Sequence, residues 1–416
     1  MAVFLGPAAA PPGRYGKCGL VSRTNGLAFI FDYLIKIHSM PKSLTGKPQL
    51  NRFVNRRLIL DKIRRDGKIS RAELAKQTSI RPPTVSAIVK QLLVEGLVEE
   101  IGNGQTSGGR APRMIALSRN QPQALGFEMS ETGISAGVCD LGGRLCAHHQ
   151  VSYTPVPPEQ AVERLYEIGS KLLRELDIDW QKLQGVGVAI PGHLKLGEGI
   201  VRWSSPFNWR DIPLKQLCEE RWGVKTDVVN DSLAGSMAAH LFDTAQSVEN
   251  LVFLYVRFLD VSHGVVGLGT GIIINGQPYH GEFGAAGEIT TPVTHPLVRM
   301  KAVGNESFET VAAFTQAVER GDPQALDAME LVGAELATLV LHVVNLLEPG
   351  VLMIGSDVPI LRDILLDHWQ RVLETQSLAY EAGKTQLMAS TLGEYGVVRG
   401  AIVPTLQRVF RIPQWS

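Results

Sequence analysis

The sequence predicts an α/β protein in which an N-terminal winged helix-turn-helix precedes a two-lobed α/β domain. Two observations predict this architecture. Within residues 41–118, three helical patterns are followed by two strand patterns that flank a glycine-rich loop. Within residues 119–416, strand-like runs followed by helical runs occur twice. This repetition is typical of two α/β lobes with a ligand cleft between them, and we expect the cleft near residues 230–310.

The charge distribution favours a nucleic-acid partner. The chain has 41 basic and 41 acidic residues, but residues 41–120 hold 16 Lys and Arg against 6 Asp and Glu, and residues 121–416 hold 21 against 34. A basic segment joined to an acidic one is typical of a polyanion-binding module. We therefore expect double-stranded DNA as a partner.

Cysteine usage and hydropathy favour a cytoplasmic protein. The four cysteines form no C-x-x-C pair, which indicates neither a disulfide framework nor a thiolate metal site. The apolar run over residues 27–37 is too short to span a bilayer. Residues 1–40 are rich in Ala, Pro and Gly, so we expect either a disordered tail or a start codon placed too far upstream.

The first helix is expected over residues 55–66, and Ser70 with Glu73 forms a capping box for a second helix over residues 71–77. Pro82 and Pro83 are tolerated in the first turn of a third helix, because N–H groups there have no intrahelical partner. The buried stripe of this helix is expected to consist of Val85, Val89, Leu92 and Leu93.

The third helix is expected to enter the major groove of DNA. Its candidate DNA-contacting residues are Arg81, Pro83, Thr84, Ser86, Lys90 and Gln91. In the following wing, glycines allow close backbone approach, and Arg110 and Arg113 suit the negative potential of a narrow minor groove. The alternative is a helical protein-interaction module of the same shape.

Several segments of the chain resemble the ROK family of repressors, open reading frames and sugar kinases, and specifically its regulator branch. In chain order these segments are residues 70–75, 83–86, 107–110, 185–192, 229–232, 267–276, 284–288, 304–310 and 390–401. The resemblance implies an actin-like, sugar-kinase-like ATPase fold for residues 119–416.

The resemblance also implies a sugar-binding cleft. In family kinases the Asp of an Asn-Asp pair is the general base that accepts the proton of a sugar hydroxyl, and here that pair is Asn230-Asp231. A helix N-cap explains the same pair equally well. The candidate sugar or effector residues are Asn208, Asn230, Asp231, Glu288, Thr291 and Glu309.

The phosphate-binding segments depart from the family pattern. Where the kinases carry Asp-x-Gly-x-Thr, this chain has Glu128-Met129-Ser130-Glu131-Thr132, which places an extra carboxylate where phosphate binds. The run Gly267, Gly269 and Gly271 resembles a vestigial nucleotide loop, and a hairpin between buried strands is the alternative. We therefore expect no catalytic residue, with Asp231 a vestigial base.

The metal-binding segment departs as well. Family members commonly carry a zinc-binding cysteine-rich loop after a Gly-Glu-x-Gly-His motif, but no cysteine follows Cys218 here, and Thr291 stands in place of the His. His263 and His295 lack partners at ligand spacing, and packing or surface roles are expected for them. We expect no metal and no cofactor.

Taken together, these patterns predict a homodimeric or homotetrameric repressor of carbohydrate genes that binds a DNA operator and a sugar or sugar phosphate. The rival hypothesis is a hexose kinase with a DNA-binding arm. A third is a repressor that responds to a protein partner.

Overall fold

The computed structural model describes residues 48–103, 111–118, 124–195, 197–245, 248–259, 261, 263–289, 292–304, 308–377, 380 and 385–410. Within it, residues 55–412 form one compact unit. The expected N-terminal extension over residues 1–40 lies outside the described residues, as do Arg110 and Thr291.

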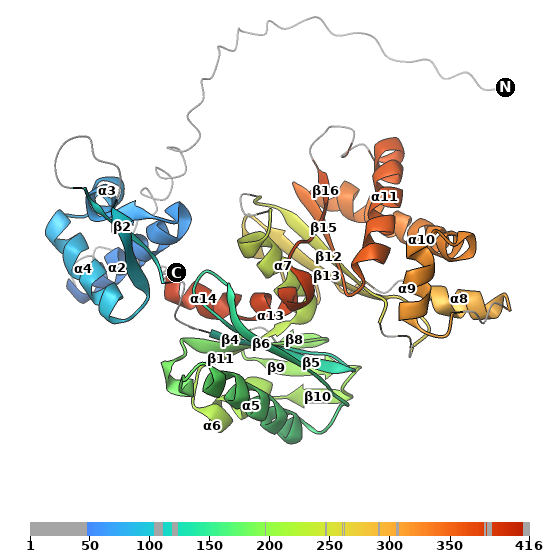
Figure 1. The fold of residues 1–416 in the computed structure, drawn as a ribbon, viewed down its shortest axis with the longest axis horizontal. Coiled ribbons are helices and arrows are strands. Elements are labelled where there is room, and N and C mark those ends of the chain that lie inside the picture. Colours follow the sequence, from blue (N-terminus) through green and yellow to red (C-terminus); the bar gives the residue numbers. More distant parts are fainter. Residues whose placement is uncertain are drawn as a thin grey trace, which may run out of the picture. The chain divides into compact units, whose positions relative to one another are not determined.

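The N-terminal part of this unit is a winged helix-turn-helix, which confirms the predicted fold (Figure 1). Its strands pair in the order β1-β3-β2, so the wing hairpin gains a short third strand that the sequence did not predict. The elements are α2 (Pro48–Asp66), β1 (Ile69–Ser70), α3 (Arg71–Thr78), α4 (Pro82–Val94), β2 (Val98–Asn103) and β3 (Arg113–Leu117).

Local sequence signals explain these helices. Ser70 caps α3, and its hydroxyl accepts a hydrogen bond from the Glu73 amide at 3.1 Å. Helix α4 begins with Pro82 and Pro83, as predicted. Its buried stripe contains Ile88, while Leu93 is only half-buried. The predicted stripe was therefore wrong at one position, because Ile88 lies three residues after Val85 and so shares its face.

The first lobe of the larger domain is built on a five-stranded sheet with the order β11-β7-β4-β5-β6. Helices α5 and α6 cover one face, and α13 packs on the other (Figure 1). A Cβ atom on Gly187 would lie 2.0 Å from the Ala401 carbonyl oxygen, so only glycine allows α13 this close. The elements are β4 (Ala124–Met129), β5 (Gly133–Cys139), β6 (Leu145–Ser152), α5 (Pro158–Glu175), β7 (Gly185–Ile190), α6 (Leu214–Trp222), β11 (Thr226–Asn230) and α13 (Gly396–Ala401).

The second lobe has a five-stranded sheet with the order β14-β13-β12-β15-β16. Helix α7 packs against β12 and β13 and also against α13, so it lies between the two lobes. A small sheet, β10-β9-β8, extends the first lobe. The elements are β8 (His193–Lys195), β9 (Ile200–Ser204), β10 (Trp209–Ile212), α7 (Asp231–Phe242), β12 (Leu251–Arg257), β13 (Gly267–Ile274), β14 (Gln277–Pro278), α8 (Pro296–Ala302), α9 (Val311–Glu319), α10 (Pro323–Leu347), β15 (Val351–Ser356), α11 (Pro359–Gln376) and β16 (Gln386–Ala389).

Helix α10 is long and apolar enough to cross a membrane by length and composition, with a mean hydropathy of 1.6 over its most apolar stretch. The core helix of a soluble protein passes the same test. Met329, Leu336 and Val344 of α10 are buried in the core of the second lobe, where they pack with side chains of α11 and β15.

The last described helix, α14 (Val403–Phe410), contacts the winged helix-turn-helix. Leu406 and Phe410 belong to the same buried cluster as the core of α2, α3 and α4. Arg57 of α2 donates a hydrogen bond to the Arg408 carbonyl oxygen at 2.6 Å. The Arg408 guanidinium is in turn ion-paired with Asp227 of β11. Helix α14 thus connects the DNA-binding module to the strand that leads into the cleft.

Candidate functional site

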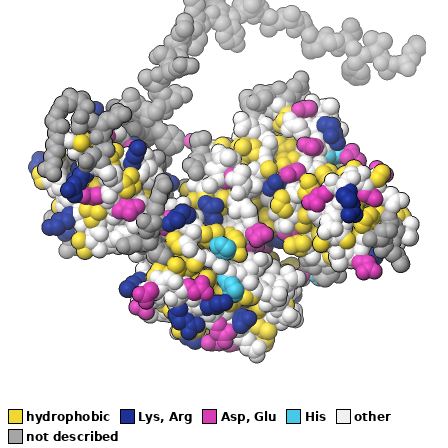
Figure 2. Space-filling model, viewed as in Figure 1, with side chains coloured by type: hydrophobic (Ala, Val, Ile, Leu, Met, Phe, Trp, Pro, Cys, Tyr) yellow, Lys and Arg dark blue, Asp and Glu magenta, His cyan; other side chains and the backbone are white. Residues whose placement is uncertain are grey.

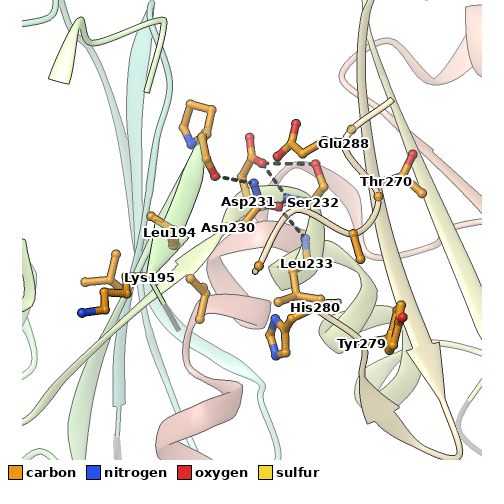
Figure 3. A pocket seen from close by; sticks show the side chains of 18 of the residues that line it. Leu194, Lys195, Asn230, Asp231, Ser232, Leu233, Thr270, Tyr279, His280 and Glu288 are labelled. Carbon is orange, nitrogen blue, oxygen red and sulfur yellow. Dashed lines mark hydrogen bonds between the residues drawn. The ribbon is translucent and has the colours of Figure 1, made fainter. Parts of the chain in front are cut away.

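A cavity of about 140 Å³ lies where the two lobes meet, at the carboxyl end of β11 (Figure 3). This is the edge of an α/β sheet where ligands commonly bind. The side chains that define it come from the β11–α7 junction, from β8, β12 and β13, and from the segment after β14. They include Lys195, Asn230, Asp231, Ser232, Leu233, Arg257, Thr270, Tyr279, His280 and Glu288.

Asn230 lines this cavity and also caps α7. Its side-chain oxygen accepts hydrogen bonds from the amides of Ser232 and Leu233 at 3.0 and 3.1 Å. Its amide nitrogen donates to the Gly192 carbonyl oxygen at 3.2 Å. The N-cap interpretation of the Asn-Asp pair is therefore correct, and capping holds Asn230 at the cavity wall.

Both carboxylate oxygens of Asp231 are occupied. Oδ1 accepts hydrogen bonds from the Ser232 amide at 2.7 Å and from the Ser232 hydroxyl at 3.1 Å. Oδ2 accepts one from Arg257 at 2.5 Å. The Asp231 side chain is 8% exposed and that of Arg257 26%, so water screens this ion pair only partly. Both oxygens of this carboxylate are thus engaged by neighbouring side chains and the α7 backbone.

Arg257 is surrounded by further acidic and aromatic groups. Its guanidinium lies 5.0 Å from the centre of the Tyr255 ring. Burial raises the pKa of nearby Glu128 to about 7, with Arg257 opposing the rise and Asp231 and Asp357 adding to it. Burial also raises the pKa of Asp357. The hydrogen bonds that this carboxylate accepts from the amides of Phe258 and Leu259 oppose the rise. An arginine thus lies among the carboxyl groups of the cleft.

The expected phosphate-binding segment forms a tight turn. Ser130 Oγ accepts a hydrogen bond from the Gly133 amide and also contacts the Gly133 carbonyl oxygen, both at 3.0 Å. Glu131 lies 3.4 Å from His263 Nε2. The turn is closed on itself by its own side chain.

The glycine run is part of a strand, which fits the alternative interpretation as a hairpin between buried strands. Gly267, Gly269 and Gly271 all lie in β13, paired with β12. A Cβ on Gly269 would lie 1.9 Å from Ser232 Oγ, and one on Gly271 would lie 2.3 Å from the Ser232 carbonyl oxygen. These glycines therefore allow α7 to pack closely on β13.

Glu288 is exposed and lines the cavity, and its role in a sugar site stays a prediction. Partial desolvation by the cavity wall, together with the charge of Asp231, raises its pKa. In Figure 3, Glu288 lies close to Asp231 and Ser232, whereas His280 lies beside Leu233. The cavity thus has an acidic end and a histidine end.

Two other predicted sugar residues are not brought to this cavity. Asn208 is an exposed residue with φ of 51° in the turn between β9 and β10. Glu309 is exposed just before α9. Both expectations rested on sequence neighbours, and the turn and helix geometry places these side chains elsewhere. Thr291 lies outside the described residues.

Arg257 and His280 were missed by reasoning from sequence. Arg257 ends an apolar strand at the carboxyl edge of a sheet, where a charged residue is a signal for a ligand site. His280 follows β14 and carries no comparable signal. Burial lowers its pKa, so its imidazole is neutral at neutral pH.

The part of the chain that the structure describes contains no cluster of three His, Cys, Asp or Glu side chains suited to a metal ion. His295 is buried and caps α8: its Nδ1 accepts the Leu297 amide at 3.1 Å, and its Nε2 lies 2.9 Å from the Phe258 carbonyl oxygen. His295 therefore has a packing role.

The described residues proposed to contact DNA lie at the start of α4, on α4 and on β3. Those with exposed side chains are Arg81, Pro83, Ser86, Lys90 and Arg113, while Thr84 is half-buried. Gln91 donates to Glu95 at 2.7 Å. Arg113 donates to Glu100 at 2.6 Å, and Arg71 binds the same carboxylate. Figure 2 shows Lys and Arg side chains on the visible face of this module.

Comparisons with known proteins agree with this architecture. The sequence model of the ROK family matches residues 124–295, and a winged helix-turn-helix DNA-binding model matches residues 54–99. The segment that matches the ROK family lies within the larger α/β domain. This domain contains the cavity residues from Lys195 to Glu288.

One relative is the xylose repressor of Bacillus spizizenii, which is 31% identical over 238 residues, or 57% of this chain and 59% of that protein. The match therefore spans less than two thirds of the relative. Two solved structures share the fold of the larger α/β domain. A ROK family transcriptional regulator, a homologue of the E. coli MLC protein, is 20% identical with a TM-score of 0.69, over 87% of this chain and 97% of the other. A ROK family glucokinase from Streptomyces griseus, in complex with glucose and AMPPNP, is 20% identical with a TM-score of 0.57, over 67% and 97%.

Proposed function

We propose that this protein is a DNA-binding transcriptional repressor of carbohydrate genes, and that a saccharide in the cleft of its ROK domain controls its operator affinity. One observation carries the proposal: a winged helix-turn-helix, with polar residues exposed on α4, contacts through α14 the strand that leads into the cleft. Such a connection allows a ligand to bias the position of the DNA-binding helix.

The polar groups of the cavity support a saccharide ligand. Asp231 and Glu288 present carboxylate oxygens, and Asn230, Lys195 and Arg257 supply N–H donors. Sugar hydroxyls both donate and accept hydrogen bonds, so a site of this composition can satisfy several of them. The repressor hypothesis is also supported by the name of the Bacillus relative, a xylose repressor.

We propose further that the protein does not transfer phosphate. The Asp231 carboxylate, which would act as the base, is ion-paired with Arg257, and the turn at Ser130 is closed by its own hydroxyl. Arg257 lies among the carboxyl groups of the cleft, whereas a phosphate-bound metal ion would need free acidic ligands. The rival hypothesis is a hexose kinase with a DNA-binding arm. It would need both the Asp231–Arg257 ion pair and the hydrogen bond that closes the Ser130 turn to break.

The proposed repressor is cytoplasmic and acts as a homodimer or homotetramer on an inverted-repeat operator. A symmetric dimer presents two recognition helices to two half-sites about one helical turn apart. The reduced cysteines Cys139, Cys146 and Cys218 agree with a reducing compartment.

Fluorescence anisotropy with DNA from the protein's own promoter region tests this function. We expect binding at least about 10³-fold tighter than to random DNA at physiological salt. Addition of D-xylose or D-glucose should change the affinity for the operator. Equal affinity for both DNAs would contradict the repressor proposal. Turnover of Mg-ATP and a hexose at roughly 10 per second would support the kinase instead.

A further inference from the structure

A second cavity adjoins the one already described. Five residues form walls of both: Gly197, Val228, Val229, Leu233 and His280. We call the first the inner cavity, at Asn230 and Glu288, and the second the outer cavity, at Lys215 and Gln407. The outer cavity measures about 470 Å³. That volume lies within the range of about 300–1,000 Å³ that is typical of small-molecule sites.

Three polar side chains of the outer cavity have unused hydrogen-bonding capacity. Lys215, His280 and Gln407 make no side-chain hydrogen bond or ion pair within the described part of the chain, and all three are half-buried. Met237, Pro278 and Pro404 supply apolar wall beside them. A mixture of polar groups and apolar wall suits a sugar ring, which has hydroxyls at its edge and C–H groups on its faces.

The charges on the lining are balanced. In the inner cavity Asp231 is paired with Arg257 and Lys195 with Glu198, which leaves the Glu288 carboxylate. In the outer cavity Asp227 is paired with Arg408, which leaves the Lys215 ammonium. Because one group of each sign remains, the two cavities together have no excess charge, and their lining favours a neutral ligand that spans both over a phosphorylated one.

We propose that the effector is a neutral saccharide of two rings, with one ring in the inner cavity and the second in the outer cavity against α14. This inference rests on the proposed function and specifies the class of ligand. The second ring contacts Pro404 and Gln407, and the next residue, Arg408, accepts the hydrogen bond from Arg57 of α2. A two-ring ligand therefore touches the helix that contacts the DNA-binding module, and a single ring in the inner cavity does not.

Calorimetry on the full-length protein tests the proposal with two pairs of sugars, D-xylose with xylobiose and D-glucose with cellobiose. In at least one pair we expect the disaccharide to bind about tenfold tighter or more. The same disaccharide should change operator affinity more than its monosaccharide does. Glucose 6-phosphate is the charged comparison, and tighter binding of this probe than of every disaccharide would overturn the proposal.

Gln407→Trp fills the outer cavity and leaves the inner one untouched. It should bring the affinity for the disaccharide to within about threefold of that for the monosaccharide, whose own affinity should not change. Gln316→Trp, on the exposed face of α9, is the matched control and should preserve both affinities. Thermal unfolding shows whether each variant is folded. If Gln407→Trp does not fold, Lys215→Ala is used as the milder variant.

The outcomes separate this inference from the proposed function. Two results would overturn the two-ring ligand and leave a saccharide-responsive repressor. One is that the monosaccharides bind as tightly as both disaccharides, and the other is that Gln407→Trp loses affinity equally for the monosaccharide and the disaccharide. Failure of every saccharide to alter operator binding would overturn the proposed control by saccharide itself.

Discussion

Arg257 donates a hydrogen bond to Asp231 Oδ2 at 2.5 Å across the cleft, from the end of β12 to the start of α7. The two residues are 26 positions apart in the chain. This ion pair neutralises the carboxylate that a phosphoryl-transfer reaction would use as its base, and it links the second-lobe sheet to the helix between the lobes. The ion pair therefore helps the cleft to keep its shape and to bind a ligand.

Loss of either partner of this pair should destabilise the protein. Arg257→Met leaves Asp231 without its cation, and Asp231→Asn leaves Arg257 without its anion. A double-mutant cycle by chemical denaturation should give a coupling energy of about 1–3 kcal/mol, because the pair is largely removed from water. The exposed pair Arg202–Asp211 is the control, with an expected coupling below ~1 kcal/mol. Similar couplings for the two pairs would contradict this prediction.

Glu128 should make stability depend on pH. Burial raises its pKa to about 7, so the folded protein holds this proton more tightly than the unfolded chain. The resulting stabilisation is complete at low pH and is lost as the pH rises toward and through 7. Glu128→Gln should therefore melt about 2 °C or more above the wild type at pH 8 and show less advantage at pH 6. Differential scanning fluorimetry measures this, with Glu167→Gln as an exposed control. If the gain in melting temperature of Glu128→Gln did not depend on pH, Glu128 would not be the titrating group.

The exposed residues of α4 should differ in their effects on DNA binding. Lys90→Ala should weaken binding to all sequences and reduce the slope of log K against log salt by about 0.9, as expected for one lost phosphate contact. Ser86→Ala should relax sequence preference at one base pair by about 1–3 kcal/mol. Anisotropy titrations over a salt series distinguish the two. Lys171→Ala, on α5 of the larger α/β domain, should change neither quantity.

Arg57 should couple the cleft to the DNA-binding module. Arg57→Ala removes the hydrogen bond to the Arg408 carbonyl oxygen. We expect the saccharide to bind with wild-type affinity while its effect on operator affinity shrinks about fivefold or more, since coupling energies are commonly about 1–3 kcal/mol. Arg56→Ala is the neighbouring control, because Arg56 pairs with Glu95 inside the winged helix-turn-helix. An unchanged saccharide effect in Arg57→Ala would show that α14 does not transmit it.

Glu288 should be needed for the response to saccharide but not for operator binding. Glu288→Ala removes an acceptor at the cavity wall, and each unpaired polar partner costs about 1–3 kcal/mol. Calorimetry should show the loss of saccharide affinity, and anisotropy should show operator affinity within about twofold of the wild type. Glu309→Ala serves as the control, since Glu309 lies away from the cavity. A normal saccharide response in Glu288→Ala would place the site elsewhere.

The sequence by itself determined the elements whose signals lie within one or two turns of the chain. Ser70, Pro82 and Pro83 mark helix starts, and the Asn230 side chain caps the helix that follows it. Such signals are local, because a cap or a proline acts on backbone groups two or three residues away. The repeated pattern of strand-like runs followed by helical runs predicted the two lobes.

Only the tertiary structure decided which side chains share the cleft. Arg257 reaches Asp231 because β12 and α7 pack together, whereas the turn at Asn208 and the segment before α9 carry Asn208 and Glu309 away from the cavity. The glycines of β13 follow the pattern of a phosphate loop but serve the close approach of α7. The same residue types fit both interpretations, and the difference depends on contacts between segments far apart in the chain, which no local pattern encodes.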